Sequence, residues 1–381
     1  MKKILLFVLT ASLLFSLTPR AGAVNLEVAG KSAVLMDTAT GTVLYEKNAH
    51  EPLAPASVTK IMTMLLIMEA IDSGKIRWED MVTASETAAA KGGSQIYLKV
   101  GETMSVSDMV KSIAVSSAND CACAMAEHLA GSEAAFVEAM NQRAKDLGMK
   151  DTNFVNCTGL DDGPDAQKHK TSAYDIALMS RELLVNHPDI KKYTTIWMDT
   201  VRNGAFGLSN TNKLIRFYSG ATGLKTGFTS GAGYCLSATA EREGMELIAV
   251  VMGCQTSTER NAACKQLLDY GFANYAVVSP MPEEALEVEV TLGASAGVRL
   301  VPGEQPKLLI EKGLKGGITT EATLSEGVTA PVARGQNLGT LTVRCGDQIL
   351  AEIPLVAESE VARLGWGELF GLVMRDIAMG C

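Results

Sequence analysis

Ser57 and Lys60 are a pair of residues in this chain whose types and spacing could carry out a reaction. They lie three positions apart at the start of a predicted helix, which places the hydroxyl and the amine on one face. Residues 61–68 are nearly all apolar, so the helix is predicted to be buried, and a buried lysine loses part of its preference for the charged form. A neutral lysine could take the proton of the serine, which is a weak nucleophile without a base. The pair therefore predicts nucleophilic catalysis by Ser57 with Lys60 as the base.

The same pair also has a structural interpretation. In that interpretation, Ser57 is a helix cap without a catalytic role, and Lys60 extends its amine to water. A serine and a lysine at this spacing occur by chance roughly once or twice in a chain of this length. The pair alone favours the structural interpretation, and the functional one depends on further motifs.

Ser117 and Asn119 form a second motif, in a polar segment between stretches of helical spacing at 106–114 and 121–129. On a tight turn between two helices, their side chains could point into a cleft. The alternative is that the segment only caps the second helix, and for this motif alone capping is favoured.

The third motif is Lys225-Thr226-Gly227, with Thr229 two positions further on. It precedes a predicted hairpin with strands at 234–240 and 245–252, so it is expected on or beside the edge of a sheet. There Lys225 and Thr226 could face a groove, and Gly227 would let a ligand approach the backbone closely. Such a triplet is expected roughly once in ten chains of this composition, which makes it the most informative motif of the three. The alternative is an edge-strand lysine that hinders aggregation.

The surrounding patterns predict two domains. A hairpin at 31–37 and 42–46 and helices at 134–147, 173–184 and 258–275 surround the motifs, which indicates one mixed domain over 25–277. From 286 onward, short alternating strands separated by Gly and Pro predict a small all-β domain over 283–357. That domain has no catalytic constellation and is interpreted as a spacer or an interaction domain.

The two ends of the chain suggest export and a membrane contact. Lys2 and Lys3, an apolar run at 4–17 and the small residues at 21–23 predict a signal peptide over 1–23, so the protein would act outside the cytoplasmic membrane, at its outer face. Residues 358–381 predict an amphipathic helix that is too short to span a bilayer. Such a helix could lie in the membrane interface, which is favoured, or dock on the protein itself.

Composition narrows the possible partners. The chain has 381 residues and a net charge of −9 with dispersed charges, so nucleic acid is not expected as a partner. Its eight cysteines and four histidines show no metal-ligand spacing. An oxidising compartment would permit disulfides, but small buried hydrophobic residues are the favoured interpretation, and no pairing can be deduced.

In order along the chain, Ser57-x-x-Lys60, Ser117-x-Asn119 and Lys225-Thr226-Gly227 resemble the motif set of penicillin-binding proteins and β-lactamases. Segments 55–63, 116–120, 223–229 and 232–236 are similar to low-molecular-mass penicillin-binding proteins of the D-alanyl-D-alanine carboxypeptidase family. The resemblance covers about 25–275, and the β domain and terminal helix match the layout of the family. It implies an α+β fold of the β-lactamase/transpeptidase type, with an antiparallel sheet between helices, followed by the all-β domain.

The resemblance also implies a mechanism. Ser57 would attack the penultimate D-Ala carbonyl of a peptidoglycan stem pentapeptide and form an acyl-enzyme, with Lys60 as its base. Ser117 and Asn119 would relay protons and hold the substrate amide. The substrate-binding residues would come from the third motif: Lys225, Thr226, Gly227 and Thr229. β-Lactams would acylate the same serine, and no metal or organic cofactor is implied.

Three alternatives stay open. A class A β-lactamase shares the motifs but normally lacks the β domain and the terminal helix. An endopeptidase or transpeptidase acting on cross-links would use the same residues. A catalytically idle wall-binding scaffold is disfavoured by the intact Ser57, Lys60 and Lys225. Phe228 stands where some relatives carry His, which leaves substrate preference and deacylation efficiency open.

Overall fold

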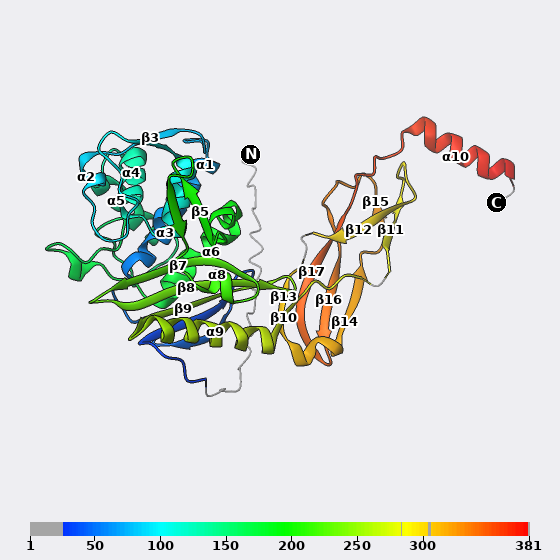
Figure 1. The fold of residues 1–381 in the computed structure, drawn as a ribbon. Coiled ribbons are helices and arrows are strands. Elements are labelled where there is room, and N and C mark those ends of the chain that lie inside the picture. The colour runs from blue at the N-terminus through cyan, green and yellow to red at the C-terminus, as the bar shows by residue number, and fades with distance from the viewer. Residues whose placement is uncertain (1–25, 283, 304–305, 380–381) are drawn as a thin grey trace, which may run out of the picture.

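A five-stranded antiparallel sheet forms the centre of the N-terminal domain (Figure 1). The computed structural model describes residues 26–282, 284–303 and 306–379, so the predicted signal peptide 1–23 lies outside the described residues. The strands, in spatial order, are β2 (Val43–Lys47), β1 (Ser32–Asp37), β9 (Met245–Cys254), β8 (Gly233–Arg242) and β7 (Ala221–Thr229). β7 is an edge strand, as predicted for the Lys225 motif.

Helices cover both faces of this sheet, which explains why its central strands are nearly continuous apolar runs. On β1, Val34 and Met36 point into one core, while Ala33 and Leu35 point into the other. α9 (Ser257–Asn274) packs on the second face, and α1 (Lys60–Asp72) and α6 (Ala173–Asn186) lie over the first (Figure 1).

α1 lies within a helical lobe and is buried almost all round. Its neighbours are α3 (Val106–Ser116), α4 (Asn119–Ala130) and α5 (Glu133–Asp146). The predicted helix start is tighter than expected, because Ala56–Thr59 form a 3-10 turn before α1 begins. The smaller elements are α2 (Glu86–Ala89), α7 (Lys191–Thr194), α8 (Leu214–Phe217), 3-10 turns at Ala166–Lys168 and Pro188–Ile190, and the paired strands β3 (Met81–Thr83) with β4 (Thr103–Ser105) and β5 (Met198–Val201) with β6 (Phe206–Ser209).

The C-terminal domain is all-β and has its own apolar core. Its main sheet has the order β14 (Ile318–Leu324), β16 (Asn337–Cys345), β17 (Gln348–Ala357), β12 (Gly297–Pro302), β11 (Leu286–Thr291) and β15 (Val328–Thr329). β10 (Tyr275–Val278) pairs with β13 (Leu308–Glu311) where the two domains meet. There Lys312, in the 3-10 turn Lys312–Gly317, donates to the carbonyl of Phe272 at the end of α9 over 2.7 Å. The predicted fold class is confirmed.

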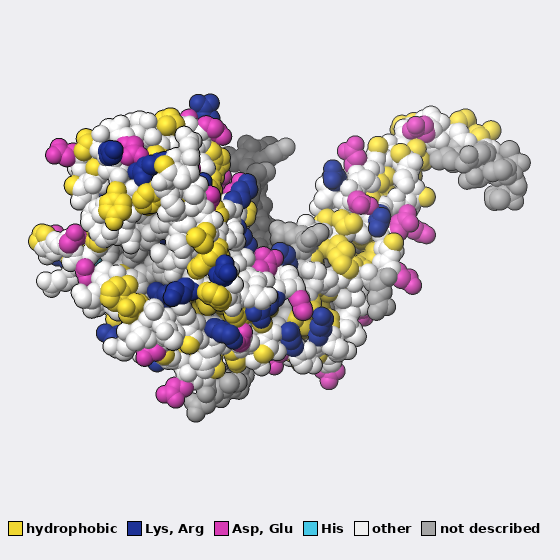
Figure 2. All heavy atoms as spheres, viewed as in Figure 1, with side chains coloured by type: hydrophobic (Ala, Val, Ile, Leu, Met, Phe, Trp, Pro, Cys, Tyr) yellow, Lys and Arg dark blue, Asp and Glu magenta, His cyan; other side chains and the backbone are white. Residues whose placement is uncertain are grey.

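The last helix, α10 (Trp366–Met379), projects away from the β domain (Figure 1). The prediction of a helix from 358 is wrong for its first eight residues, because that segment is held in the β domain. Val361 is buried and bridges Val332, and Arg363 bridges Gly293. Apolar side chains lie on the surface of α10 (Figure 2), where Trp366 and Phe370 are exposed. Across the described residues, none of the helices has the length and apolar character needed to cross a membrane.

The cysteines within the described ranges are all free thiols. Six of them are buried, and Cys345 is partly buried: the six are Cys121, Cys123, Cys157, Cys235, Cys254 and Cys264. Cys381 lies outside the described residues.

Candidate active site

Ser57 and Lys60 meet at the start of α1. Lys60 Nζ lies 2.9 Å from Ser57 Oγ and donates to the Thr158 carbonyl over 2.8 Å. Ser57 is partly exposed, whereas Lys60 is fully buried. Burial lowers the pKa of Lys60 to about 7, although Cys157 and Asp120 act in the opposite direction. A sizeable share of Lys60 is therefore neutral near pH 7, and its lone pair can accept the Ser57 proton across this short distance.

Two glycines allow the backbone to close around Ser57. A Cβ added to Gly159 would lie 1.8 Å from the Ala56 carbonyl oxygen, and Gly159 has a φ of +83°. A Cβ added to Gly227 would lie 2.6 Å from the Pro55 carbonyl oxygen and 3.1 Å from the Ser57 nitrogen. The serine turn is thus clamped between the loop at Gly159 and the edge strand β7, which no larger residue would permit.

Ser117 and Asn119 lie at the junction of α3 and α4. Ser117 has a left-handed backbone with a φ of 63°, and Asn119 Nδ2 donates to the Gly92 carbonyl over 2.7 Å. Within the described part of the chain, Ser117 Oγ and Asn119 Oδ1 are buried and lack a hydrogen-bond partner. Buried polar atoms are costly when unpaired, so these two are suited to bonding a ligand.

Lys225 lies on β7 and is almost fully buried, with an exposed fraction of 1%. Its Nζ donates to the Thr226 carbonyl over 3.0 Å, and Thr226 Oγ1 donates to Thr211 Oγ1 over 2.7 Å. Burial, followed by the charges of Lys60 and Arg260, lowers the pKa of Lys225 well below its ordinary value. No salt bridge to Lys225 occurs among the described residues. A ligand carboxylate would supply the missing opposite charge.

The three motifs converge on one place. A Cβ on Gly93 would lie 2.8 Å from Asn119 Nδ2 and 3.2 Å from Leu160 Cδ2, so the Asn119 turn adjoins the loop that holds Lys60. The Thr211 amide, beside Thr226, donates to the Val115 carbonyl at the end of α3 over 3.1 Å. The side chains of the three motifs therefore come from elements that adjoin one another around Ser57.

Thr229 and Phe228 lie further along β7. Thr229 Oγ1 accepts from the Ala232 amide over 3.1 Å and so closes the turn between β7 and β8. Phe228 is exposed and stacks on Tyr234 with ring centroids 4.2 Å apart. The Thr229 hydroxyl accepts in this turn, and its O–H can still donate to a ligand.

The sequence motifs missed several supporting residues, of which His169 is the clearest. Its Nδ1 accepts from the Val155 amide over 3.1 Å. Its Nε2 lies 2.8 Å from Thr59 Oγ1, which itself donates to the Ala56 carbonyl, so Nε2 carries the proton. Burial, then Lys170 and Lys60, lowers the pKa of His169 to about 4, which keeps the ring neutral. Arg260 and Thr158 were also missed, because nothing in their local sequence marks them.

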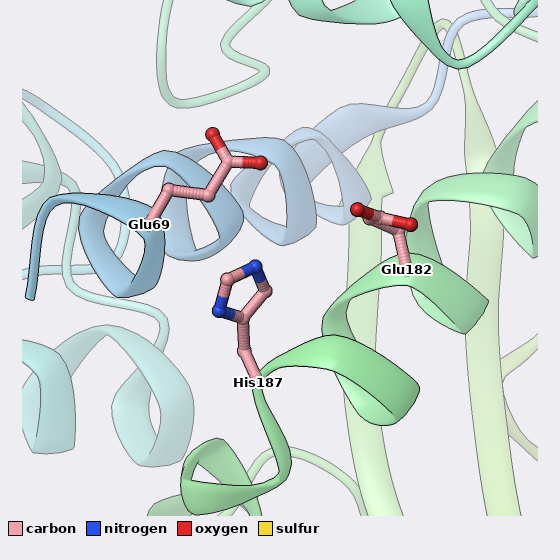
Figure 3. A group of neighbouring side chains, drawn as sticks. All are labelled: Glu69, Glu182 and His187. Carbon is pink, nitrogen blue, oxygen red and sulfur yellow. The ribbon is translucent and has the colours of Figure 1, made fainter. Parts of the chain in front are cut away.

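One group of side chains has the composition of a metal site: Glu69, Glu182 and His187, whose ligand atoms lie within 4.8 Å of one another (Figure 3). Arg143 already bonds both carboxylates, over 2.6 and 2.5 Å, and His187 bonds Asp72. The group lies toward the C-terminal end of α1, roughly 13 Å along the helix from Lys60. We interpret it as an ion-pair network that joins α1, α5 and α6.

Comparisons with known proteins agree with this geometry. Residues 19–256 match the family described as D-alanyl-D-alanine carboxypeptidase, and residues 282–363 match the penicillin-binding protein 5 C-terminal domain. The chain is 43% identical to D-alanyl-D-alanine carboxypeptidase DacF of Bacillus subtilis, over 99% of each chain. It is 34% identical to DacC of Escherichia coli, over 96% of this chain and 94% of the relative. Penicillin-binding protein 5 of Haemophilus influenzae superposes with a TM-score of 0.73 at 31% identity, covering 88% of this chain and 98% of that one.

Proposed function

This chain belongs to the D-alanyl-D-alanine carboxypeptidase family, and on that premise we propose which of its residues carry out the reaction. The protein is a serine-type D-alanyl-D-alanine carboxypeptidase, and its family acts on peptidoglycan peptides and binds β-lactams. The observation that carries our assignment is the 2.9 Å contact between Lys60 Nζ and Ser57 Oγ inside a buried site.

In the acylation step, neutral Lys60 takes the proton of Ser57 while Oγ attacks the carbonyl carbon of the penultimate D-Ala. The bond to the terminal D-Ala nitrogen then breaks, and that nitrogen receives a proton from the Lys60 ammonium through Ser117. Asn119 holds the substrate amide with its unpaired Oδ1. The products are free D-Ala and an ester on Ser57.

Lys225 and Thr226 bind the terminal carboxylate of the substrate, and Arg260 adds positive charge nearby. The tetrahedral oxyanion accepts hydrogen bonds from the Ser57 amide and from an amide of β7 near Phe228 or Thr229. This placement is supported by Gly227, which brings β7 against the Ser57 nitrogen.

Deacylation uses the same base. Water enters once D-Ala has left, Lys60 removes its proton, and the hydroxide attacks the ester carbonyl. A β-lactam leaves its amine tethered to the acyl group, which blocks this approach, so the penicillin adduct persists.

The test is the intact mass of the protein after incubation with penicillin, followed by release of D-Ala from a diacyl-D-Ala-D-Ala peptide. We expect one penicillin adduct and D-Ala release by the wild type, and neither by Ser57→Ala. An adduct without release would favour an endopeptidase or a scaffold, and fast penicillin turnover a β-lactamase. Absence of any adduct would rule out the assignment of Ser57.

We also propose export through a signal peptide at 1–23 and peripheral contact with the outer face of the membrane through α10, the helical part of the predicted segment 358–381. The contact is supported by Trp366, Phe370 and Met374, which are spaced four apart on α10 and are 91%, 68% and 50% exposed. Co-sedimentation with phospholipid vesicles is expected for residues 24–381 and not for a chain that ends at 365. Equal sedimentation of both chains would refute the contact.

A further inference from the structure

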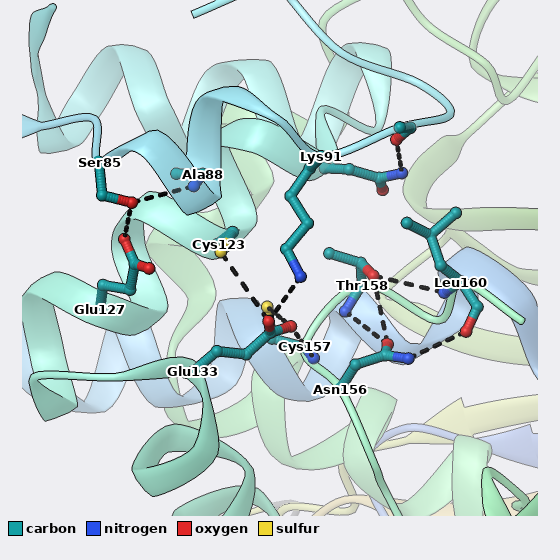
Figure 4. Close-up of polar contacts among 12 residues, drawn as sticks. Ser85, Ala88, Lys91, Cys123, Glu127, Glu133, Asn156, Cys157, Thr158 and Leu160 are labelled. Carbon is teal, nitrogen blue, oxygen red and sulfur yellow. Dashed lines mark hydrogen bonds and ion pairs between the residues drawn. The ribbon is translucent and has the colours of Figure 1, made fainter. Parts of the chain in front are cut away.

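The Thr158 carbonyl, which accepts from Lys60, belongs to a segment that is fixed by charged and polar side chains (Figure 4). Glu133, in the first turn of α5, accepts from both the amide and the thiol of Cys157, each over 3.2 Å, through Oε1. Its other oxygen accepts from Lys91 Nζ over 2.6 Å. Glu133 therefore holds the residue immediately before Thr158.

A second contact, from α1, fixes the backbone of the same residue. Thr63 Oγ1 donates to the Cys157 carbonyl over 2.6 Å, and Thr63 lies one helical turn after Lys60. The Cys157 backbone is thus bonded at its amide by α5 and at its carbonyl by α1. Movement of either helix contact would displace the Thr158 carbonyl that follows.

Cys157 and Thr158 are buried, and a cavity adjoins the segment that contains them. A cavity of about 250 Å³ is lined by Lys91, Asn156, Thr158 and neighbouring loop residues. Asn156 Oδ1 accepts from the amides of Thr158 and Gly159 over 3.1 and 2.6 Å, which shapes the turn but does not tie it to a helix. Asn141 of α5 bonds the Phe154 amide and carbonyl three residues earlier, over 2.8 Å each, and Glu133 provides the bond from α5 to Cys157 itself.

The protonation states of Glu133 and Cys157 favour a lasting hydrogen bond between them. Burial acts to raise the pKa of Glu133, but hydrogen bonds from Lys91 and Cys157 outweigh it and leave that pKa lowered. The contact with Cys123 and burial raise the pKa of Cys157, so its thiol stays protonated and can donate. The carboxylate and its donors therefore persist through the neutral pH range.

We propose that Glu133, paired with Lys91, is a positioning residue for acyl transfer: it fixes the backbone amide of Cys157, the residue before Thr158, and the Thr158 carbonyl holds Lys60 beside Ser57. The proposal depends on the role of Lys60 in the proposed function. A lysine side chain has four rotatable bonds, so a base at its end needs a second anchor besides the serine. Small misplacements of a catalytic group are costly, on the order of 100-fold for about 1 Å.

The experiment measures the rate constant of penicillin acylation from pH 5 to pH 9, together with kcat and KM for D-Ala release. We expect Glu133→Gln to lower the acylation rate constant and kcat by about tenfold, with KM changed less than about twofold. In the pH profile of the Glu133→Gln variant, the rise of the acylation rate constant should occur at lower pH than in the wild type. The reason is that a displaced Thr158 carbonyl no longer stabilises the Lys60 ammonium. Glu138→Gln is the matched control, since Glu138 lies on the exposed side of the same helix.

Variants of Lys91 provide an independent second test of whether the Glu133–Lys91 pair positions Lys60. They can be used even if Glu133→Gln does not fold. Lys91→Met removes the ion pair and should slow acylation, whereas Lys91→Arg preserves it and should restore most of the rate. A lowered melting temperature with an unchanged acylation rate and pH profile of the folded protein would mean that the network is only structural and would overturn the proposal. Failure of the wild type itself to form an adduct would instead refute the proposed function.

Discussion

The two domains of this protein differ in how many polar side chains they bury. Among the described residues, the buried polar and charged side chains all lie between Ser32 and Arg260, and the five buried atoms without a partner lie between Ser32 and Asn119. The core of the β domain is built from apolar side chains such as Val343 and Leu355. Buried charges without partners cost stability. We infer that the N-terminal domain accepts this cost because a lysine base and a carboxylate site must be desolvated to function.

The largest effect is expected from Lys60→Met, which keeps the volume of the buried side chain but removes the base. Acylation by penicillin should fall by about 100- to 10,000-fold. The free energy of unfolding should rise, because a group that is costly to bury has been replaced by an apolar one. Stopped-flow acylation and urea unfolding measure the two quantities. A loss of activity together with a loss of stability would mean that Lys60 is also a structural anchor.

Lys225→Gln should have the next largest effect, because it removes the charge that faces the substrate carboxylate. We expect kcat/KM for D-Ala release to fall by about 10- to 100-fold, the range for a charge-assisted hydrogen bond. A peptide whose terminal carboxylate is replaced by an amide serves as the control. Wild type and variant should process that peptide at similar rates, and a large difference between them would place the role of Lys225 elsewhere.

Leu355→Ala tests the apolar core of the β domain and should leave the acylation rate unchanged. Leu355 is fully buried in the β domain, so its truncation should lower the free energy of unfolding of that domain by about 2–5 kcal/mol. Ile349→Ala, on an exposed position of the same strand, should change it by less than about 0.5 kcal/mol. Slower acylation in the folded Leu355→Ala protein would show that the domains are coupled.

Sequence patterns predicted the elements whose periodicity is strong. The hairpin of β1 and β2, the long helices and the edge position of Lys225 follow directly from apolar spacing and turn residues. β14 was not predicted, because its sequence is rich in Thr and has few apolar residues although its burial alternates, and the β5–β6 hairpin was not predicted, because each of its strands has only four residues. The start of α10 was misplaced because Val361, at the beginning of the predicted helix, is buried in the β domain through its bridge to Val332, a long-range contact that local spacing does not reveal.

The sequence predicted the parts of the site that consist of reactive side chains, but not the part that consists of backbone groups. Ser57, Lys60 and Lys225 could be named from their types and spacing, because those features carry the chemistry. The Thr158 carbonyl could not, since every residue has one and only the fold decides which points at Lys60. His169, Glu133 and Arg260 contribute through long-range contacts that no local spacing reveals.

The pH dependence of Ser57 acylation in the wild type tests most sharply whether Lys60 is the base. Lys60 has a pKa lowered to about 7, and its neutral form is the base. The acylation rate constant should therefore fall about tenfold per pH unit below 7 and level off above it. That limb should vanish in Lys60→Met. A rate that keeps rising toward pH 10, as an exposed lysine would produce, or a flat profile from pH 5 to pH 9, would contradict the account.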